Sequence, residues 1–126
     1  MNYGEFVNTV IERGGPSDRE AAQQVTQTVL ADLGQRLTGD EAQDLAAQLP
    51  EGLKQPVTEH VAAEPVVDDV DDFLRRVADH LGEGTDPDQA RGYVRAVFTA
   101  LTEAVSAGAI GHVRDQLPAG FAPLFD

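Results

Sequence analysis

The chain has 126 residues, 41% of them hydrophobic, and a formal net charge of −13, which allows one domain with a packed core and excludes a disordered chain. The negative charge argues against nucleic-acid binding, because affinity for phosphate backbones comes largely from lysine and arginine. No apolar run approaches the ~20 residues that span a bilayer, and without cysteine the chain has no disulfide or thiolate metal site.

Two helices are expected at the start of the chain. Apolar residues at three- and four-residue spacing predict a first helix at about residues 3–13, and the Gly-Gly-Pro sequence at 14–16 ends it. Ser17 is expected to cap a second helix, with Glu20 completing a capping box. This second helix is expected to run to about Leu37.

The second helix is predicted to bury one apolar stripe. Polar residues such as Asp32 and Arg36 are expected to lie largely off that stripe. The residues expected on it are Ala22, Val25, Thr26, Val29, Leu30, Leu33 and Leu37.

Two shorter segments are expected next. Thr38 is predicted to cap a third helix, with Glu41 as its capping-box partner. Pro50 suits the first turn of a short fourth segment, because the first N–H groups of a helix need no partner. Leu53 and Val57 are expected to pack that segment onto the core.

A linker is expected at about residues 59–68, and four further segments follow it in the same order. Their predicted boundaries are a Gly-Glu-Gly-Thr turn at 82–85, a cap at Thr85, a helix end near Val105 and a closing segment at 118–125. The apolar residues expected to carry the core here are Phe73, Leu74, Val77, Leu81, Ala90, Tyr93, Val94, Val97, Phe98, Leu101, Val105, Ile110, Val113, Leu117, Phe121 and Phe125.

The two halves of the chain are related in sequence. Residues 22–58 align with 90–126 at a constant offset of 68, with seven identities that include most of a Gln-Leu-Pro-x-Gly box at 48–52 and again at 116–120. Repeated sequence predicts repeated structure. We therefore expect a single all-α domain over residues 1–126, made of two tandem four-segment helical repeats, at 3–58 and 69–126, packed as one pseudo-two-fold helical bundle.

Three stretches together resemble a known bacterial family. They are GQRLTGDEAQDLAAQLPEGLK, VDDFLRRVADHLG and VRDQLPAGFAPLF, preceded by a Tyr-x-x-Phe start at Tyr3 and Phe6. The family is catalogued as domain of unknown function 2267. The resemblance covers almost the whole chain and implies a small, soluble, all-helical protein. The family has no established activity, so the resemblance supplies no catalytic residues.

The histidines and acidic residues offer no assembled site in the sequence. His60, His80 and His112 form no His-x-x-x-His pair for zinc and are expected at the surface or its boundary. A site built in three dimensions from His80, His112 and carboxylates is the alternative.

The densest acidic stretch, residues 68–72, lacks the ligand pattern of a calcium loop. It is expected to cap the following helix and to pair, four residues on, with Arg75 and Arg76, with weak divalent binding as the alternative.

Hydroxyls and glycines are also expected to be structural. Ser17, Thr38 and Thr85 stand where caps belong, Ser106 does not, and none has an evident base beside it. The glycines at 82 and 84 lack the strand and lysine of a phosphate loop, and the acidic residues of 37–49 oppose DNA binding by a helix-turn-helix. The two Leu-Pro-x-Gly boxes are expected to stop and restart helices, with a pair of docking corners as the alternative.

No catalytic, cofactor-binding or metal-binding residue is designated, and no cofactor is expected. The sequence favours a non-enzymatic, soluble protein-interaction or ligand-binding helical module; the alternative is a carboxylate- and histidine-dependent metal-binding protein or enzyme. The charge favours a basic protein partner, with no nucleic acid and no membrane.

A monomer is expected if the aromatic residues all serve the core, and a homodimer if the stripe within 84–106 is exposed. The N-terminus lacks the pattern of a signal peptide, so a cytoplasmic location is expected.

Overall fold

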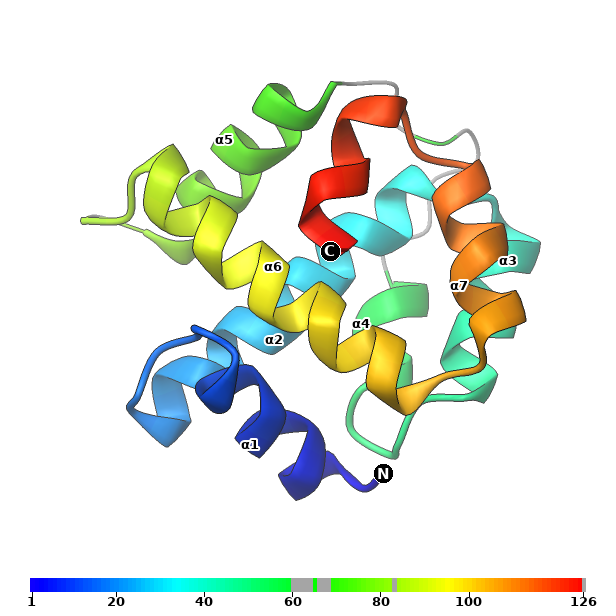
Figure 1. Cartoon of the computed structure of the whole chain (residues 1–126), viewed down its shortest axis with the longest axis horizontal. Coiled ribbons are helices and arrows are strands. Elements are labelled where there is room, and N and C mark those ends of the chain that lie inside the picture. The colour runs from blue at the N-terminus through cyan, green and yellow to red at the C-terminus, as the bar shows by residue number, and fades with distance from the viewer. Residues whose placement is uncertain (60–64, 66–68, 83, 126) are drawn as a thin grey trace.

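The structure is a computed structural model that describes residues 1–59, 65, 69–82 and 84–125. Within these ranges the chain forms helices and no strand, as predicted (Figure 1). Most of the expected linker, including His60 and Asp68, lies outside the described residues. The elements are α1 (Tyr3–Glu12), α2 (Arg19–Arg36), α3 (Gly39–Ala47), α4 (Lys54–Glu59), α5 (Val70–Leu81), α6 (Pro87–Ala104), α7 (Ala107–Asp115) and the 3₁₀ helix η1 (Ala119–Phe125).

The two longest helices, α2 and α6, form the centre of the fold. Each has 18 residues, and Figure 1 shows α6 crossing in front of α2. Helix α2 contacts α1, α4, α5 and α6, and α6 also contacts α1, α5, α7 and η1. Their apolar stripes meet in one core, as the periodicity predicted. Its largest fully buried side chains are Phe6, Phe73, Phe98, Phe121, Leu30, Leu33, Leu37, Leu45, Leu53, Leu74, Leu101 and Leu124.

The prediction that Asp32 and Arg36 lie off the buried face was wrong. Asp32 is 1% exposed and Arg36 is 5% exposed. The reason is that these residues stand seven positions after Val25 and Val29, on the side of α2 that its apolar stripe buries. The polar side of α2 stays open to solvent, with Gln24 and Gln27 exposed. The Arg36 guanidinium lies over the Phe121 ring, 5.5 Å from its centroid.

Two predicted caps were wrong by one residue. Asp18, not Ser17, caps α2 by accepting a hydrogen bond from the Ala21 N–H at 2.9 Å. Asp86, not Thr85, caps α6 by accepting one from the Gln89 N–H at 2.8 Å. A carboxylate is a stronger acceptor than a hydroxyl, so the aspartate takes the position where both residue types suit a cap.

Ser106 was wrongly excluded from the caps. It is the N-cap of α7, and its hydroxyl accepts a hydrogen bond from the Ala109 N–H at 3.2 Å. Thr38 caps α3 as predicted, by accepting one from the Glu41 N–H at 3.3 Å.

The first Leu-Pro box forms a tight corner between α3 and α4. Pro50 precedes α4 instead of lying in its first turn, and the Leu53 N–H donates to the Pro50 carbonyl oxygen at 3.1 Å. Gly52 has a φ of 95°, and a Cβ atom there would lie 2.8 Å from the Tyr3 ring. Glycine is therefore required at this corner, by backbone conformation and by space.

The closing segment is packed, as predicted. Phe121, Leu124 and Phe125 of η1 are buried. The Phe121 ring lies edge-on to Phe73, with centroids 5.2 Å apart, and the Phe125 ring stacks on Phe98 at 4.5 Å. This segment closes the core between α5 and α6.

Candidate functional site

A hollow of about 390 Å³ lies between α3 and α7, two short helices from opposite halves of the chain. Figure 1 shows these helices side by side at one end of the molecule. Helix α3 and its C-cap supply the acidic and amide side chains of the lining and one alanine, and α7 with its N-cap supplies the other four residues. The lining residues are Glu41, Asp44, Ala47, Gln48, Ser106, Gly108, Ala109 and His112.

Two glutamines join the helices that form this hollow. The Gln48 side-chain oxygen accepts a hydrogen bond from the Ser106 N–H at 2.8 Å. The Gln116 side-chain oxygen accepts one from the Thr38 N–H at 2.9 Å, and its amide nitrogen donates to the Thr38 hydroxyl at 3.2 Å. Gln116, not Glu41, therefore bonds the Thr38 backbone, and the predicted reciprocal capping box is wrong. The C-cap of each helix is thereby tied to the N-cap of the other.

Glu41 carries the strongest chemical signal in the hollow. Its residue is 9% exposed, yet its carboxylate has no hydrogen bond or ion pair within the part of the chain that the structure describes. The Glu41 oxygens are not among the buried side-chain atoms that lack a hydrogen-bond partner, so they stay in contact with solvent. The positive end of the α3 dipole favours the negative charge, because Glu41 lies in the first turn of α3. The carboxylate remains available to a cation that enters the hollow.

The remaining lining residues add acceptors and leave space. Asp44 stands one turn after Glu41 on the same helix and is exposed. On the α7 wall, a Cβ atom at Gly108 would meet nothing within 4 Å, and Ala109 has only a methyl group. The acidic side chains of α3 therefore face an α7 wall that carries only Ser106, Ala109 and the exposed His112 as side chains.

The arrangement suits an organic cation better than a metal ion. Among the described residues, no group of three or more His, Asp or Glu side chains is placed to hold a metal. A guanidinium or ammonium group on a flexible side chain reaches both carboxylates without a fixed coordination geometry. Of the two histidines in the alternative metal site, His112 lines the same hollow as these carboxylates and His80 does not.

His80 belongs to a second polar cluster, between α2 and α5. Its Nδ1 lies 2.9 Å from Oδ1 and 3.0 Å from Oδ2 of the buried Asp32. The Arg76 Nε lies 3.7 Å from Oδ1 of the same carboxylate. A shallow pocket of about 360 Å³ adjoins the cluster, lined by Thr28, Ala31, Asp32, Gln35 and His80. The half-exposed imidazole is thus held by a buried carboxylate that also ties α2 to α5.

The acidic residues at the start of α5 cap this helix, as predicted, but their ion pairs are not the predicted ones. Asp69 caps α5 by accepting from the Asp72 N–H at 2.9 Å. Asp72 pairs with Arg75 at 3.0 Å, three residues on and not four. Asp71 lies 3.8 Å from Arg91 of α6. Arg76 turns inward to Asp32 instead of pairing with Asp72, because its position faces the buried side of α5.

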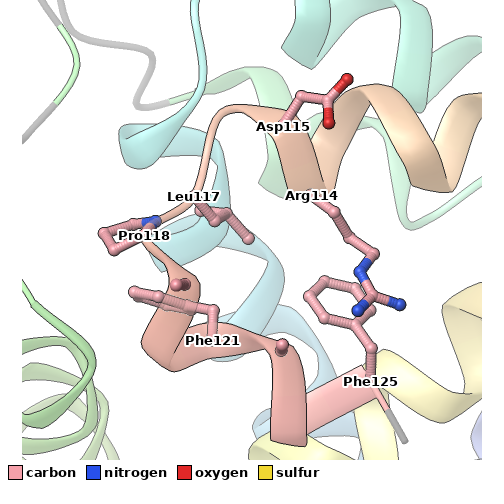
Figure 2. A pocket seen from close by; sticks show the side chains of 8 residues that line it. Arg114, Asp115, Leu117, Pro118, Phe121 and Phe125 are labelled. Carbon is pink, nitrogen blue, oxygen red and sulfur yellow. The ribbon is translucent and has the colours of Figure 1, made fainter.

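A third hollow, of about 240 Å³, lies at the second Leu-Pro box (Figure 2). Figure 2 shows Leu117, Phe121 and Phe125 around it, with the Arg114 guanidinium beside the Phe125 ring. The guanidinium carbon lies 5.2 Å from the centroid of that ring. We call this hollow the corner pocket; its lining residues are Arg114, Asp115, Leu117, Pro118, Ala119, Phe121, Ala122 and Phe125.

Sequence reasoning assigned Glu41 only to a cap and treated Gln48 and Gln116 only as part of the repeated box. A signal was nevertheless present in the alignment of the halves. At the offset of 68, Glu41 aligns with Ala109 and Asp44 with His112. Acidic residues in one half thus correspond to a small or basic residue in the other, which indicates that these positions have different roles in the two halves.

Comparison with known proteins identifies the family. A family model described as an uncharacterized conserved protein, DUF2267, matches residues 3–124, so the chain belongs to that family. No curated protein matches the chain. No helix within the described residues has the length and apolar character needed to cross a membrane.

Proposed function

We propose that this member of the family is a non-enzymatic binding module whose hollow between α3 and α7 receives a cationic side chain from a basic segment of a protein partner. The observation that carries the proposal is Glu41, whose carboxylate has no partner among the described residues and lines a hollow together with Asp44. A cation there would form a charge-assisted hydrogen bond with a carboxylate that has no other partner among the described residues. A cytoplasmic location, expected from the sequence, is part of the proposal.

The charge of the whole chain supports the same class of partner. A net charge of −13 attracts basic segments over a distance of about one Debye length and repels anionic ones. Such attraction raises the association rate, whereas the hollow supplies a defined contact. Binding is therefore expected to weaken with added salt, and to weaken further when the Glu41 carboxylate is removed.

The test is an NMR titration of the ¹⁵N-labelled protein at low salt with two blocked peptides that differ only in one residue, arginine or the neutral analogue citrulline. The arginine peptide is expected to shift backbone signals of residues 41–48 and 106–112, and the citrulline peptide is not. Glu41→Gln is expected to lower the affinity about 10- to 100-fold, the range for a hydrogen bond to a charged group.

A matched variant separates the site from the overall charge. Asp40→Asn removes one charge from the same helix as Asp44→Asn, but Asp40 does not line the hollow. The Asp44 variant is expected to weaken binding more than the Asp40 variant. Equal affinities for the arginine and citrulline peptides, or equal effects of Asp40→Asn and Asp44→Asn, would contradict the proposal.

A carboxylate- and histidine-dependent metal-binding function is the second candidate. Its support is the contact of 2.9 Å between His80 and the buried Asp32, because a carboxylate behind an imidazole is typical of metal ligands. Zinc, calcium and magnesium are added in turn, and the melting temperature is measured. A rise that disappears in His80→Gln supports this candidate, and unchanged melting with all three ions discards it.

We also infer that the halves form two tandem repeats related by a pseudo-two-fold axis. Supporting it are the paired bonds Gln48–Ser106 and Gln116–Thr38, whose members correspond at the offset of 68. In both halves the start of a first helix covers the glycine of a Leu-Pro box: Tyr3 approaches Gly52, and Val70 approaches Gly120. Equal losses of stability from paired substitutions at equivalent core positions, Leu33→Ala and Leu101→Ala, would support it.

A monomer is part of the proposal. Phe6, Phe73, Phe98, Phe121 and Phe125 are buried, and Met1 is the only large apolar side chain in the described ranges that is exposed, at 48%. Most of the α6 stripe is buried in the core, and Tyr93 is partly buried, which supports a monomer. Light scattering at several concentrations is expected to give the mass of one chain.

A further inference from the structure

The hollow between α3 and α7 contains an imidazole as well as carboxylates. His112 lines it from α7, and Glu41 and Asp44 line it from α3. The His112 side chain is exposed and has no hydrogen bond or ion pair within the part of the chain that the structure describes. Histidine is the residue whose charge ordinarily changes between about pH 5 and 8. The charge inside the hollow therefore depends on pH.

The hydrogen bonds between α3 and α7 fix the height of His112 in the hollow. They tie the start of each helix to the end of the other, so the two helices are antiparallel. Position 38 is thereby level with position 116. Counting four residues inward from this contact brings His112 level with position 42, between Glu41 and Asp44. At a rise of about 1.5 Å per residue, the His112 backbone lies within about 3 Å of both acidic residues along the helix axis.

The other charged groups around α7 lie outside the hollow. Asp40 of α3 is not part of the lining, and α6, which also packs on α7, supplies no lining residue. The α6 carboxylate nearest to α7 in the chain, Glu103, pairs with Arg13 at 3.1 Å. On α7 itself, Arg114 and Asp115 line the corner pocket. The two α3 carboxylates that share the hollow therefore act most directly on the imidazole.

A protonated imidazole competes with any other cation in this hollow. It pairs with the carboxylates that the cation needs, and it repels a second positive charge. We infer that His112 regulates the proposed binding: the neutral imidazole leaves the carboxylates to the basic residue of the partner, and the protonated imidazole competes with that residue. This inference rests on the proposed function, because the basic residue is the one proposed there.

The competition fixes the direction of the pH dependence. The affinity for a basic segment is expected to rise with pH, because loss of the His112 proton removes the competing charge. Coupling between two binding events is reciprocal. A bound cation is therefore expected to favour loss of the proton from His112.

A blocked peptide with arginine as its only ionisable residue provides the test, because its own charge does not change between pH 5.5 and 7.5. NMR titration at low salt is expected to show binding to the wild type that is about 3- to 10-fold weaker at pH 5.5 than at pH 7.5. His112→Gln is expected to bind with nearly equal affinity at both pH values. His112→Lys keeps a positive charge at both and is expected to bind weakly at both.

A matched double variant separates the hollow from the charge of the whole chain. His112→Gln combined with Gln43→His keeps the number of histidines and moves one imidazole to an exposed position of α3 that does not line the hollow. Its affinity is expected to be as independent of pH as that of His112→Gln. Titration of the carboxylates would weaken binding at low pH in all these variants, so the comparison also excludes that cause.

The ring signals of His112 give a second measurement, which needs only the wild type once His112→Gln has assigned them. Saturating arginine peptide is expected to move the midpoint of the His112 titration to lower pH. The citrulline peptide is expected to leave the midpoint unchanged.

The outcomes separate this inference from the proposed function. Arginine-dependent binding with equal affinity at both pH values, or with tighter binding at pH 5.5, overturns the role of His112 and leaves the proposed function standing. A pH dependence that persists in His112→Gln or in the double variant also overturns that role. Failure of the arginine peptide to bind at either pH overturns both proposals.

Discussion

Gly34 of α2 lies directly against the backbone of Val57 in α4, so closely that a Cβ atom at residue 34 would overlap the Val57 carbonyl oxygen. The two helices are in contact with each other. Glycine in a helix interior is unfavourable by about 0.5–1 kcal/mol relative to alanine. Glycine occupies position 34 despite this cost, because a residue with a side chain would not let the α2 and α4 backbones come so close.

Gly34→Ala is therefore expected to destabilise the fold severely. The methyl group meets backbone, which cannot move aside without separating α2 from α4. Gly92→Ala is the matched control, because Gly92 lies inside α6 and a Cβ atom there meets nothing within 4 Å. That variant is expected to gain about 0.5–1 kcal/mol. Urea denaturation measures both, and equal changes in the two variants would contradict the close α2–α4 contact.

The glutamine contacts between α3 and α7 predict a graded loss of stability. Gln116→Ala removes two hydrogen bonds to Thr38, and Gln48→Ala removes one to Ser106. At about 0.5–1.5 kcal/mol for each bond, the Gln116 variant is expected to lose more in the free energy of unfolding. Gln43→Ala, at an exposed position of α3, serves as the control and is expected to change little. A larger loss in the free energy of unfolding for Gln48→Ala than for Gln116→Ala would count against these hydrogen bonds.

The buried carboxylate of Asp32 predicts a larger loss of stability than the glutamine contacts do. Asp32→Ala leaves Arg76, whose side chain is 21% exposed, beside a site that has lost its negative charge. Breaking a buried ion pair from one side costs about 3–5 kcal/mol. His80→Gln is expected to cost much less, because the His80 side chain is 50% exposed and solvent replaces its contact. Thermal unfolding of both variants tests the difference, and similar melting temperatures would show that Asp32 does not hold α2 to α5.

The helices themselves were predictable because local spacing determines them. The stripes of α2 and α6 and their ends near Leu37 and Val105 follow from apolar periodicity. The caps at Asp18 and Asp86 were missed by one residue, because a hydroxyl and a carboxylate stand side by side there and both suit a cap.

Burial of polar residues and the hollow were not predictable in the same way. Asp32 is covered because it lies on the side of α2 that packs against other helices, and its charge gave no sign of that burial. The hollow depends on α3 meeting α7, whose connecting bonds join residues 58 and 78 positions apart. Glu41 acquires its significance only from that pairing.

The C-terminal segment supports the last prediction. Phe121 is 1% exposed and lies between the Phe73 ring, 5.2 Å away, and the Arg36 guanidinium, 5.5 Å away. Replacing a buried phenylalanine by alanine costs about 3–5 kcal/mol, a large part of the ~5–15 kcal/mol by which such domains are stable. Phe121→Ala, or deletion of residues 119–126, is therefore expected to lower the melting temperature strongly.

Phe121→Leu keeps most of the apolar volume and is expected to lie between the wild type and Phe121→Ala. A truncated chain that melts within a degree or two of the intact protein would show that η1 is not part of the core. In that case Phe121, Leu124 and Phe125 would be free to contact a partner directly.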